Sequence, residues 1–151
     1  MKTVSGDLIE LAKGGQFELI VHGCNCFCAM GAGIAKKIKK EFPGAYKADL
    51  ETKKGDKTKL GEISYANVFI EDRKFIVVNA YTQYSYSGSG RKVKYEAIRK
   101  AFHEIKNKFS GLKIGYPAIG AGLGGGDWKI ISKIIEEELE GEDHTFVEFN
   151  P

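Results

Sequence analysis

The chain has 151 residues, of which 42% are hydrophobic and 28% charged, and these values are ordinary for one globular domain. They exclude a disordered tail, a collagen-like repeat and a membrane protein. The net charge of +3 is too small to predict nucleic-acid binding by itself. Glycine departs from the ordinary composition: there are 19, about 13% of the chain against a typical 7%, and they are clustered.

The apolar patterns predict strands and helices that alternate along the chain. In chain order they are strands at residues 1–4 and 18–22, a helix at 34–42, strands at 63–70 and 75–81, a helix at 95–109, a strand at 113–116, a helix at 128–139 and a strand at 145–149. Alternation of this kind predicts an α/β fold, a three-layer α/β/α sandwich around a mostly parallel sheet, in one domain over residues 1–151.

Residues 45–61 are expected to be part helix and part loop, and residues 82–90 are expected to be loop. Ligands of mostly parallel sheets bind at the carboxyl ends of the strands, so the functional residues are sought there.

Two glycine-rich turns each follow a predicted strand and precede a predicted helix. The first contains Gly31 and Gly33, and the second has five glycines within residues 120–126. Glycine lets the backbone approach an anion, and the N–H groups at a helix N-terminus donate hydrogen bonds to it. Either turn alone is equally consistent with a simple tight turn, but the two at one sheet edge predict a diphosphate site.

Other interpretations of the motifs fail on spacing. Only 26 residues follow Gly125, too few for a dinucleotide-binding fold, and the first turn lacks the spacer of a P-loop. Cys24, Cys26 and Cys28 alternate, which is not the paired spacing of a zinc finger. We therefore expect no metal and no cofactor, and the odd number of cysteines indicates a reducing, cytoplasmic compartment.

Several ionisable residues adjoin the predicted turns. His22 ends a strand, where it is either an acid or base near neutral pH or a hydrogen-bonded residue of the core. Asp127 is expected to cap the last helix, close to any bound phosphate. Lys92 is expected at the start of the long helix, where a lysine by itself predicts only an exposed side chain. Asp7 follows the first strand, where an aspartate by itself predicts only a turn. His144 is expected at the surface.

The order of these motifs resembles the macrodomain family, whose members bind ADP-ribose. The resemblance covers nearly the whole chain, through Gly-Asp-Leu-Ile at residues 6–9, Val-His-Gly-Cys-Asn at 21–25, Met-Gly-Ala-Gly-Ile-Ala at 30–35 and the glycine-rich segment 117–128. Each piece alone is a weak signal, and it is their combination and order that are specific.

The resemblance implies roles for individual residues. Asp7 would accept a hydrogen bond from the adenine amino group, and Asn25 would contact the distal ribose. The remaining residues implied in ligand binding are Leu8, Met30, Gly31, Gly33, Ile34, Pro117, Gly120, Ala121, Gly122, Leu123 and Gly124. Of these, Gly31, Gly33 and Ile34 would surround the distal ribose and phosphate, and residues 120–124 would donate backbone N–H groups to the diphosphate.

Two enzymatic branches of the family compete. Residues 22–26 are similar to the branch that removes phosphate from ADP-ribose-1''-phosphate, in which a histidine at this place is implicated in catalysis. This branch is our first expectation, with His22 and Asp127 as acid and base.

Residues 90–96 resemble a second branch, which cleaves ADP-ribose from protein or nucleic acid through a lysine that attacks the distal ribose. Lys92 would be that nucleophile. The chain departs from this branch in two places: it has glycine around Gly124 instead of an acid, and His22 instead of an asparagine.

Two alternatives from other classes stay open. One is a reader that binds ADP-ribose without chemistry. The other is an RNA-binding domain that uses the nine lysines of residues 36–59, a segment with only four acidic residues. These lysines are more simply explained as a solvated surface. The expected partners are ADP-ribose derivatives and ADP-ribosylated protein or nucleic acid, with no membrane, and the expected state is a monomer.

Overall fold

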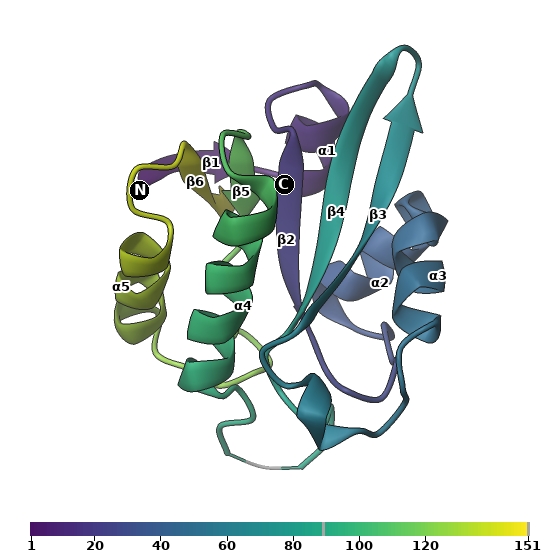
Figure 1. The fold of residues 1–151 in the computed structure, drawn as a ribbon, viewed down its shortest axis with the longest axis vertical. Helices are drawn as coiled ribbons and strands as arrows, with labels where there is room; N and C mark the ends of the chain where they lie inside the picture. Colours follow the sequence, from purple (N-terminus) through teal and green to yellow (C-terminus); the bar gives the residue numbers. More distant parts are fainter. Residues whose placement is uncertain (89, 151) are drawn as a thin grey trace.

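A six-stranded sheet runs through the middle of the molecule in the order β1-β6-β5-β2-β4-β3 (Figure 1). The computed structural model describes residues 1–88 and 90–150. The strands are β1 (Lys2–Gly6), β2 (Leu19–Cys24), β3 (Ile63–Ile70), β4 (Arg73–Tyr81), β5 (Ile114–Tyr116) and β6 (His144–Phe149). Every neighbouring pair is parallel except the β3–β4 hairpin, which confirms the predicted fold class.

Helices cover both faces of this sheet. One face carries α1 (Leu8–Lys13), α2 (Gly33–Glu41) and α3 (Pro43–Leu50), and the other carries α4 (Tyr95–Phe109) and α5 (Trp128–Glu138) (Figure 1). A short 3₁₀ helix, η1 (Lys57–Lys59), follows α3. In the described residues no helix is long and apolar enough to cross a membrane.

The predicted apolar stripes form the cores between these layers. Phe102 and Ile105 of α4 and Ile131 and Ile135 of α5 are completely buried against the sheet. On the opposite face Ile38 of α2 lies in a second core. The period of three to four residues therefore identified the sheet-facing side of each long helix correctly.

Three local features differ from the sequence-based expectation. Helix α1 was not expected, because six residues are too short to show a helical period; Asp7 caps it by accepting from the N–H groups of Ile9 and Glu10. The long helix begins at Tyr95, three residues later than Lys92. His144 is buried, with Nδ1 2.7 Å from the hydroxyl oxygen of Tyr116, and burial lowers its pKa.

The topology fixes where a site can form. Strands β5, β2 and β4 are adjacent, parallel and central, so their carboxyl ends meet at one edge of the sheet. The segments that leave these three strands carry both glycine-rich turns and Lys92.

Candidate functional site

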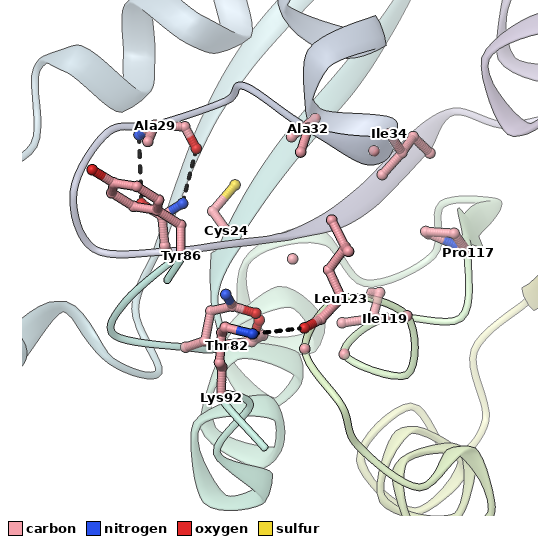
Figure 2. A pocket seen from close by; sticks show the side chains of 18 of the residues that line it. Cys24, Ala29, Ala32, Ile34, Thr82, Tyr86, Lys92, Pro117, Ile119 and Leu123 are labelled. Atoms are coloured by element: carbon pink, nitrogen blue, oxygen red, sulfur yellow. Dashed lines mark hydrogen bonds between the residues drawn. The ribbon is translucent and has the colours of Figure 1, made fainter. Parts of the chain in front are cut away.

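A cavity of about 650 Å³ opens at the carboxyl ends of β2, β4 and β5 (Figure 2). The N-terminal end of α2, marked by Ala32 and Ile34, lies across from Lys92, and Tyr86 and Pro117 lie at opposite ends (Figure 2). Ten of the residues implied by the resemblance line this cavity: Asn25, Gly31, Gly33, Ile34, Lys92, Pro117, Gly120, Gly122, Leu123 and Gly124.

The N-terminus of α2 forms one wall. Its N-cap residue, Ala32, offers no side chain to the first N–H groups of the helix. Among the hydrogen bonds of residues 1–88 and 90–150, none uses the N–H groups of Gly31, Ala32, Gly33 or Ile34. Because a helix N-terminus carries a partial positive charge, this wall can hold an anion.

The loop after β5 forms the facing wall. It is closed by hydrogen bonds from Gly126 N to Gly120 O, at 2.7 Å, and from Gly125 N to Gly122 O, at 3.1 Å. Gly120 has a φ of +75°, and a Cβ there would lie 2.6 Å from a methyl group of Val93, so only glycine fits. In the described part of the chain, the N–H groups of residues 122–124 have no protein acceptor. Two sets of backbone donors thus line one cavity.

Lys92 is held in this cavity by the same loop. Its backbone N–H donates to Gly124 O at 2.8 Å, and its Nζ donates to Leu123 O at 3.3 Å (Figure 2). The N–H of Val93 donates to the same Gly124 oxygen, at 3.1 Å. These bonds explain why α4 starts later than expected. Among the described residues that line the cavity, Lys92 is the only cation and none is a carboxylate or histidine.

His22 lies outside the cavity lining, and its ring is fully buried. Its Nε2 is 2.6 Å from Asn79 Oδ1. Because the amide nitrogen of Asn79 donates to Ala45 O and Ser64 Oγ, both at 3.0 Å, the amide oxygen accepts and His22 Nε2 donates. Burial lowers the pKa of His22 to about 4, so the ring is neutral at pH 7. The His22 ring is therefore a buried, hydrogen-bonded group next to the cavity and not part of its lining.

Cys24 lies between His22 and the cavity. Its sulfur is 3.5 Å from Nε2 and 3.8 Å from Nδ1 of His22, and these similar distances show that it is not in line with either nitrogen. Burial raises the pKa of Cys24 well above its usual value, which disfavours the reactive thiolate. All three cysteines are buried and free. Within the described residues, no cluster of three or more histidine, cysteine or acidic side chains could hold a metal.

Asp127 also lies outside the cavity lining. As expected it caps α5, accepting from the N–H of Lys129 at 2.9 Å. Its own N–H donates to the hydroxyl oxygen of Tyr95, whose ring lies under the guanidinium of Arg91 at 4.2 Å. Asp127 thereby joins the start of α5 to the start of α4.

Asp7 lines a separate hollow of about 250 Å³. Lys37, Lys40 and Glu41 of α2 line the same hollow, so α2 touches the cavity with its first turn and this hollow with its later turns. The capping bonds of Asp7 use Oδ1, which leaves the other carboxylate oxygen for a ligand. Three further implied residues do not line the cavity: Leu8 and Met30 are buried in the core, and Ala121 packs against the core that contains α4 and α5.

Asn25 shapes the first loop as well as lining the cavity. Its amide oxygen accepts from the N–H groups of Phe27 and Ala29, and its amide nitrogen donates to Ala29 O at 2.8 Å. These bonds curl residues 25–29 beside the cavity.

The residues that follow β4 also belong to the site, although their sequence did not indicate this. Thr82, Gln83 and Tyr86 line the cavity, although residues 82–90 carry no glycine-rich or charged pattern to mark them. The available signal was positional: this loop leaves a strand adjacent to β2, so it opens on the same sheet edge.

The model of the Macro domain family matches residues 21–135 of this chain. This chain belongs to the macro domain family. An uncharacterized 17.5 kDa protein of Enterobacteria phage T4 is 35% identical to this macrodomain, over all of this chain and 97% of the phage protein. A Bos taurus protein named ADP-ribose glycohydrolase is 33% identical, over 93% of this chain and 84% of its own length.

One solved structure and one further relative are also similar to this chain. The macrodomain of Mycobacterium tuberculosis DarG has the same fold, with a TM-score of 0.76 and 20% identity over 99% of this chain and 97% of that one. An Aspergillus oryzae protein named ADP-ribose 1''-phosphate phosphatase is 39% identical, but over only 30% of this chain and 21% of its own length.

Proposed function

We propose that this macrodomain binds ADP-ribose joined to a macromolecule and hydrolyses the bond at the distal ribose, with Lys92 as nucleophile. The observation that carries the proposal is the position of Lys92. Its amine lies in the cavity, tied to the loop whose N–H groups are free to hold a diphosphate.

The two hollows fit the parts of such a ligand. The facing N–H groups of the α2 N-terminus and of residues 122–124 would bind the diphosphate without any net positive charge. Asp7, in the second hollow, would accept from the adenine amino group. The distal ribose would then lie between Asn25 and Lys92.

The chemistry needs the amine of Lys92 in its neutral form. The nitrogen would form a bond to C1'' of the distal ribose while the bond from C1'' to the leaving group breaks. The leaving group would depart with the bonding electron pair and take up the proton that the nitrogen loses. Water would then cleave the lysine adduct, which releases ADP-ribose and restores the amine. No described residue of the lining supplies a carboxylate to activate that water, so we expect release to be the slower step.

The geometry supports this reaction better than phosphate removal. The phosphatase hypothesis depends on His22 and Asp127, and neither side chain lines the cavity. The comparisons give support in the same direction, because the relative named as a glycohydrolase aligns with almost the whole chain and the phosphatase with less than a third.

The test compares the intact protein with Lys92→Ala on ADP-ribosylated protein and ADP-ribosylated nucleic acid. Release of ADP-ribose should fall on the order of 1,000-fold or more in Lys92→Ala, as for loss of a nucleophile, while binding of free ADP-ribose changes only a few-fold. Lys94→Ala is the matched control, because Lys94 is exposed, two residues away and outside the lining.

Phosphate release from ADP-ribose-1''-phosphate is measured in parallel. Rapid phosphate release that survives Lys92→Ala, with no release of ADP-ribose from either macromolecule, would refute the proposal. Binding of ADP-ribose with no turnover of any substrate would identify a reader instead.

A further inference from the structure

Three aromatic side chains form a cluster beside one end of the cavity. The ring of Phe27 meets Tyr84 edge to face, with centroids 4.8 Å apart, and meets Tyr86 in the same way at 6.2 Å. Tyr86 lines the cavity, at the end away from Pro117 (Figure 2), yet 62% of the residue is exposed. A large aromatic side chain is thus held at the cavity mouth with much of its surface in solvent.

A lysine-rich segment is fastened to this cluster. Gly55 N donates to Cys26 O at 2.7 Å, and the hydroxyl of Tyr84 donates to Gly55 O at 3.1 Å. These bonds place residues 53–57 against Phe27 and Tyr84. Lys57 Nζ lies 4.9 Å from the centre of the Tyr84 ring.

The charge of this segment favours a polyanion. Lys53, Lys54 and Lys57 are exposed, and they outnumber the one acid among residues 53–57, Asp56. The carboxylate of Asp56 accepts from the N–H and hydroxyl of Thr58, and these bonds lower its pKa. The segment therefore carries a local charge of about +2 at neutral pH.

We infer that this surface, formed by Phe27, Tyr84, Tyr86 and the three lysines, binds a single strand of nucleic acid that carries the ADP-ribose. A base next to the distal ribose stacks on Tyr86, which Phe27 supports from behind, and neighbouring phosphates meet Lys53, Lys54 and Lys57. Exposed aromatic faces beside a lysine-rich surface are the combination that binds single strands without reading their sequence. The inference rests on the proposed function and assigns it a partner.

The position of Tyr86 supports this class of partner. It is the one aromatic residue among the described residues of the cavity lining, and it contacts the aromatic cluster outside. A group joined to the distal ribose near Lys92 would leave the cavity past the ring of Tyr86. A protein chain joined at the same point would gain little from a flat ring flanked by cations unless it were strongly acidic.

The experiment measures the affinity for three probes: free ADP-ribose, a single-stranded oligonucleotide with ADP-ribose on one base, and a neutral ADP-ribosylated peptide. All titrations use the Lys92→Ala background, so that the conjugates are not cleaved. The quantity compared is the ratio of oligonucleotide affinity to ADP-ribose affinity. We expect a ratio well above one that falls about tenfold in Tyr86→Ala and is retained in Tyr86→Phe.

Two further variants sharpen the test. Replacing Lys53, Lys54 and Lys57 by glutamine should flatten the salt dependence of oligonucleotide binding. Phe69→Ala removes an exposed aromatic residue of β3 that does not line the cavity, and should leave the ratio unchanged.

The outcomes separate the two proposals. A ratio near one, or tighter binding of the peptide, with free ADP-ribose still bound, overturns this inference and leaves the proposed function standing. A loss of the ratio in both Tyr86→Ala and Tyr86→Phe assigns the effect to the hydroxyl and refutes stacking. Failure of the protein to bind free ADP-ribose defeats the proposed function itself.

Discussion

The imidazole of His22 is buried on one face of the sheet, where Nε2 donates to Asn79 and no solvent reaches the ring. The partner is 57 residues away in the sequence and becomes a neighbour only because β2 and β4 pair in register. A strand-end histidine therefore could not be assigned to core or cavity from sequence. The position of the ring follows from the direction of its side chain and from the strand that pairs with β2.

This environment predicts a pH dependence of stability. In the unfolded chain a histidine takes up a proton near pH 6.5, whereas in the folded protein His22 does so near pH 4. Above pH 6.5 the ring is neutral in both states, and between pH 6.5 and 4 only the unfolded state gains the proton. The free energy of unfolding should therefore fall as the pH drops through this window, by about 3 kcal/mol from this residue.

Urea unfolding at several pH values tests this expectation with His22→Gln, which keeps a donor for Asn79 but cannot titrate. The pH dependence between 6.5 and 4 should be clearly weaker in the variant than in the intact chain. An identical dependence in His22→Gln would contradict the assigned environment of the ring.

At the scale of elements, the strands and the long periodic helices were predictable, whereas the short helix α1 and the part that the loop after β4 plays in the site were not. Helices α2, α4 and α5 show their buried faces in the spacing of their apolar residues. Helix α1 has six residues and is stabilised by the Asp7 cap and by burial, neither of which the apolar pattern reveals. The loop after β4 enters the site through sheet topology alone.

Glycines of the two glycine-rich turns are expected to affect different properties, some the affinity for ADP-ribose and one the stability of the fold. A Cβ added at Gly31 or at Gly122 would meet no protein atom within 4 Å, and both residues line the cavity. Gly31→Val and Gly122→Val should therefore lower the affinity for ADP-ribose at least about tenfold with little change in the free energy of unfolding, since the new side chain occupies the space of the ligand.

Gly120→Val is the contrasting variant, because its side chain would collide with Val93 at a positive φ. It should destabilise the fold by about 2 kcal/mol or more. Calorimetric titration of ADP-ribose and urea unfolding of the same three variants give both quantities. Unimpaired ADP-ribose binding in both Gly31→Val and Gly122→Val would show that the diphosphate does not lie between these walls.

At the scale of the whole molecule, the site is a product of strand order. The central neighbours β5, β2 and β4 bring together a loop near residue 30, a loop near residue 90 and a loop near residue 120. The motifs of the first and third loops were visible in the sequence because glycine spacing is tied to anion binding. Lys92 was visible only through resemblance, since nothing in its own neighbourhood distinguishes it from other surface lysines.

The most direct test of the account is to trap the adduct between Lys92 and the distal ribose. An amine bound to C1'' of a sugar interconverts with an imine, which borohydride reduces to a stable secondary amine. The cavity lining offers no described carboxylate to speed hydrolysis of the adduct, so it should accumulate during turnover of an ADP-ribosylated substrate. We predict that peptide mass spectrometry after reduction finds ADP-ribose on Lys92 and not on Lys94. Turnover of that substrate with no adduct on Lys92, or an adduct that persists in Lys92→Ala at another lysine, would contradict the account.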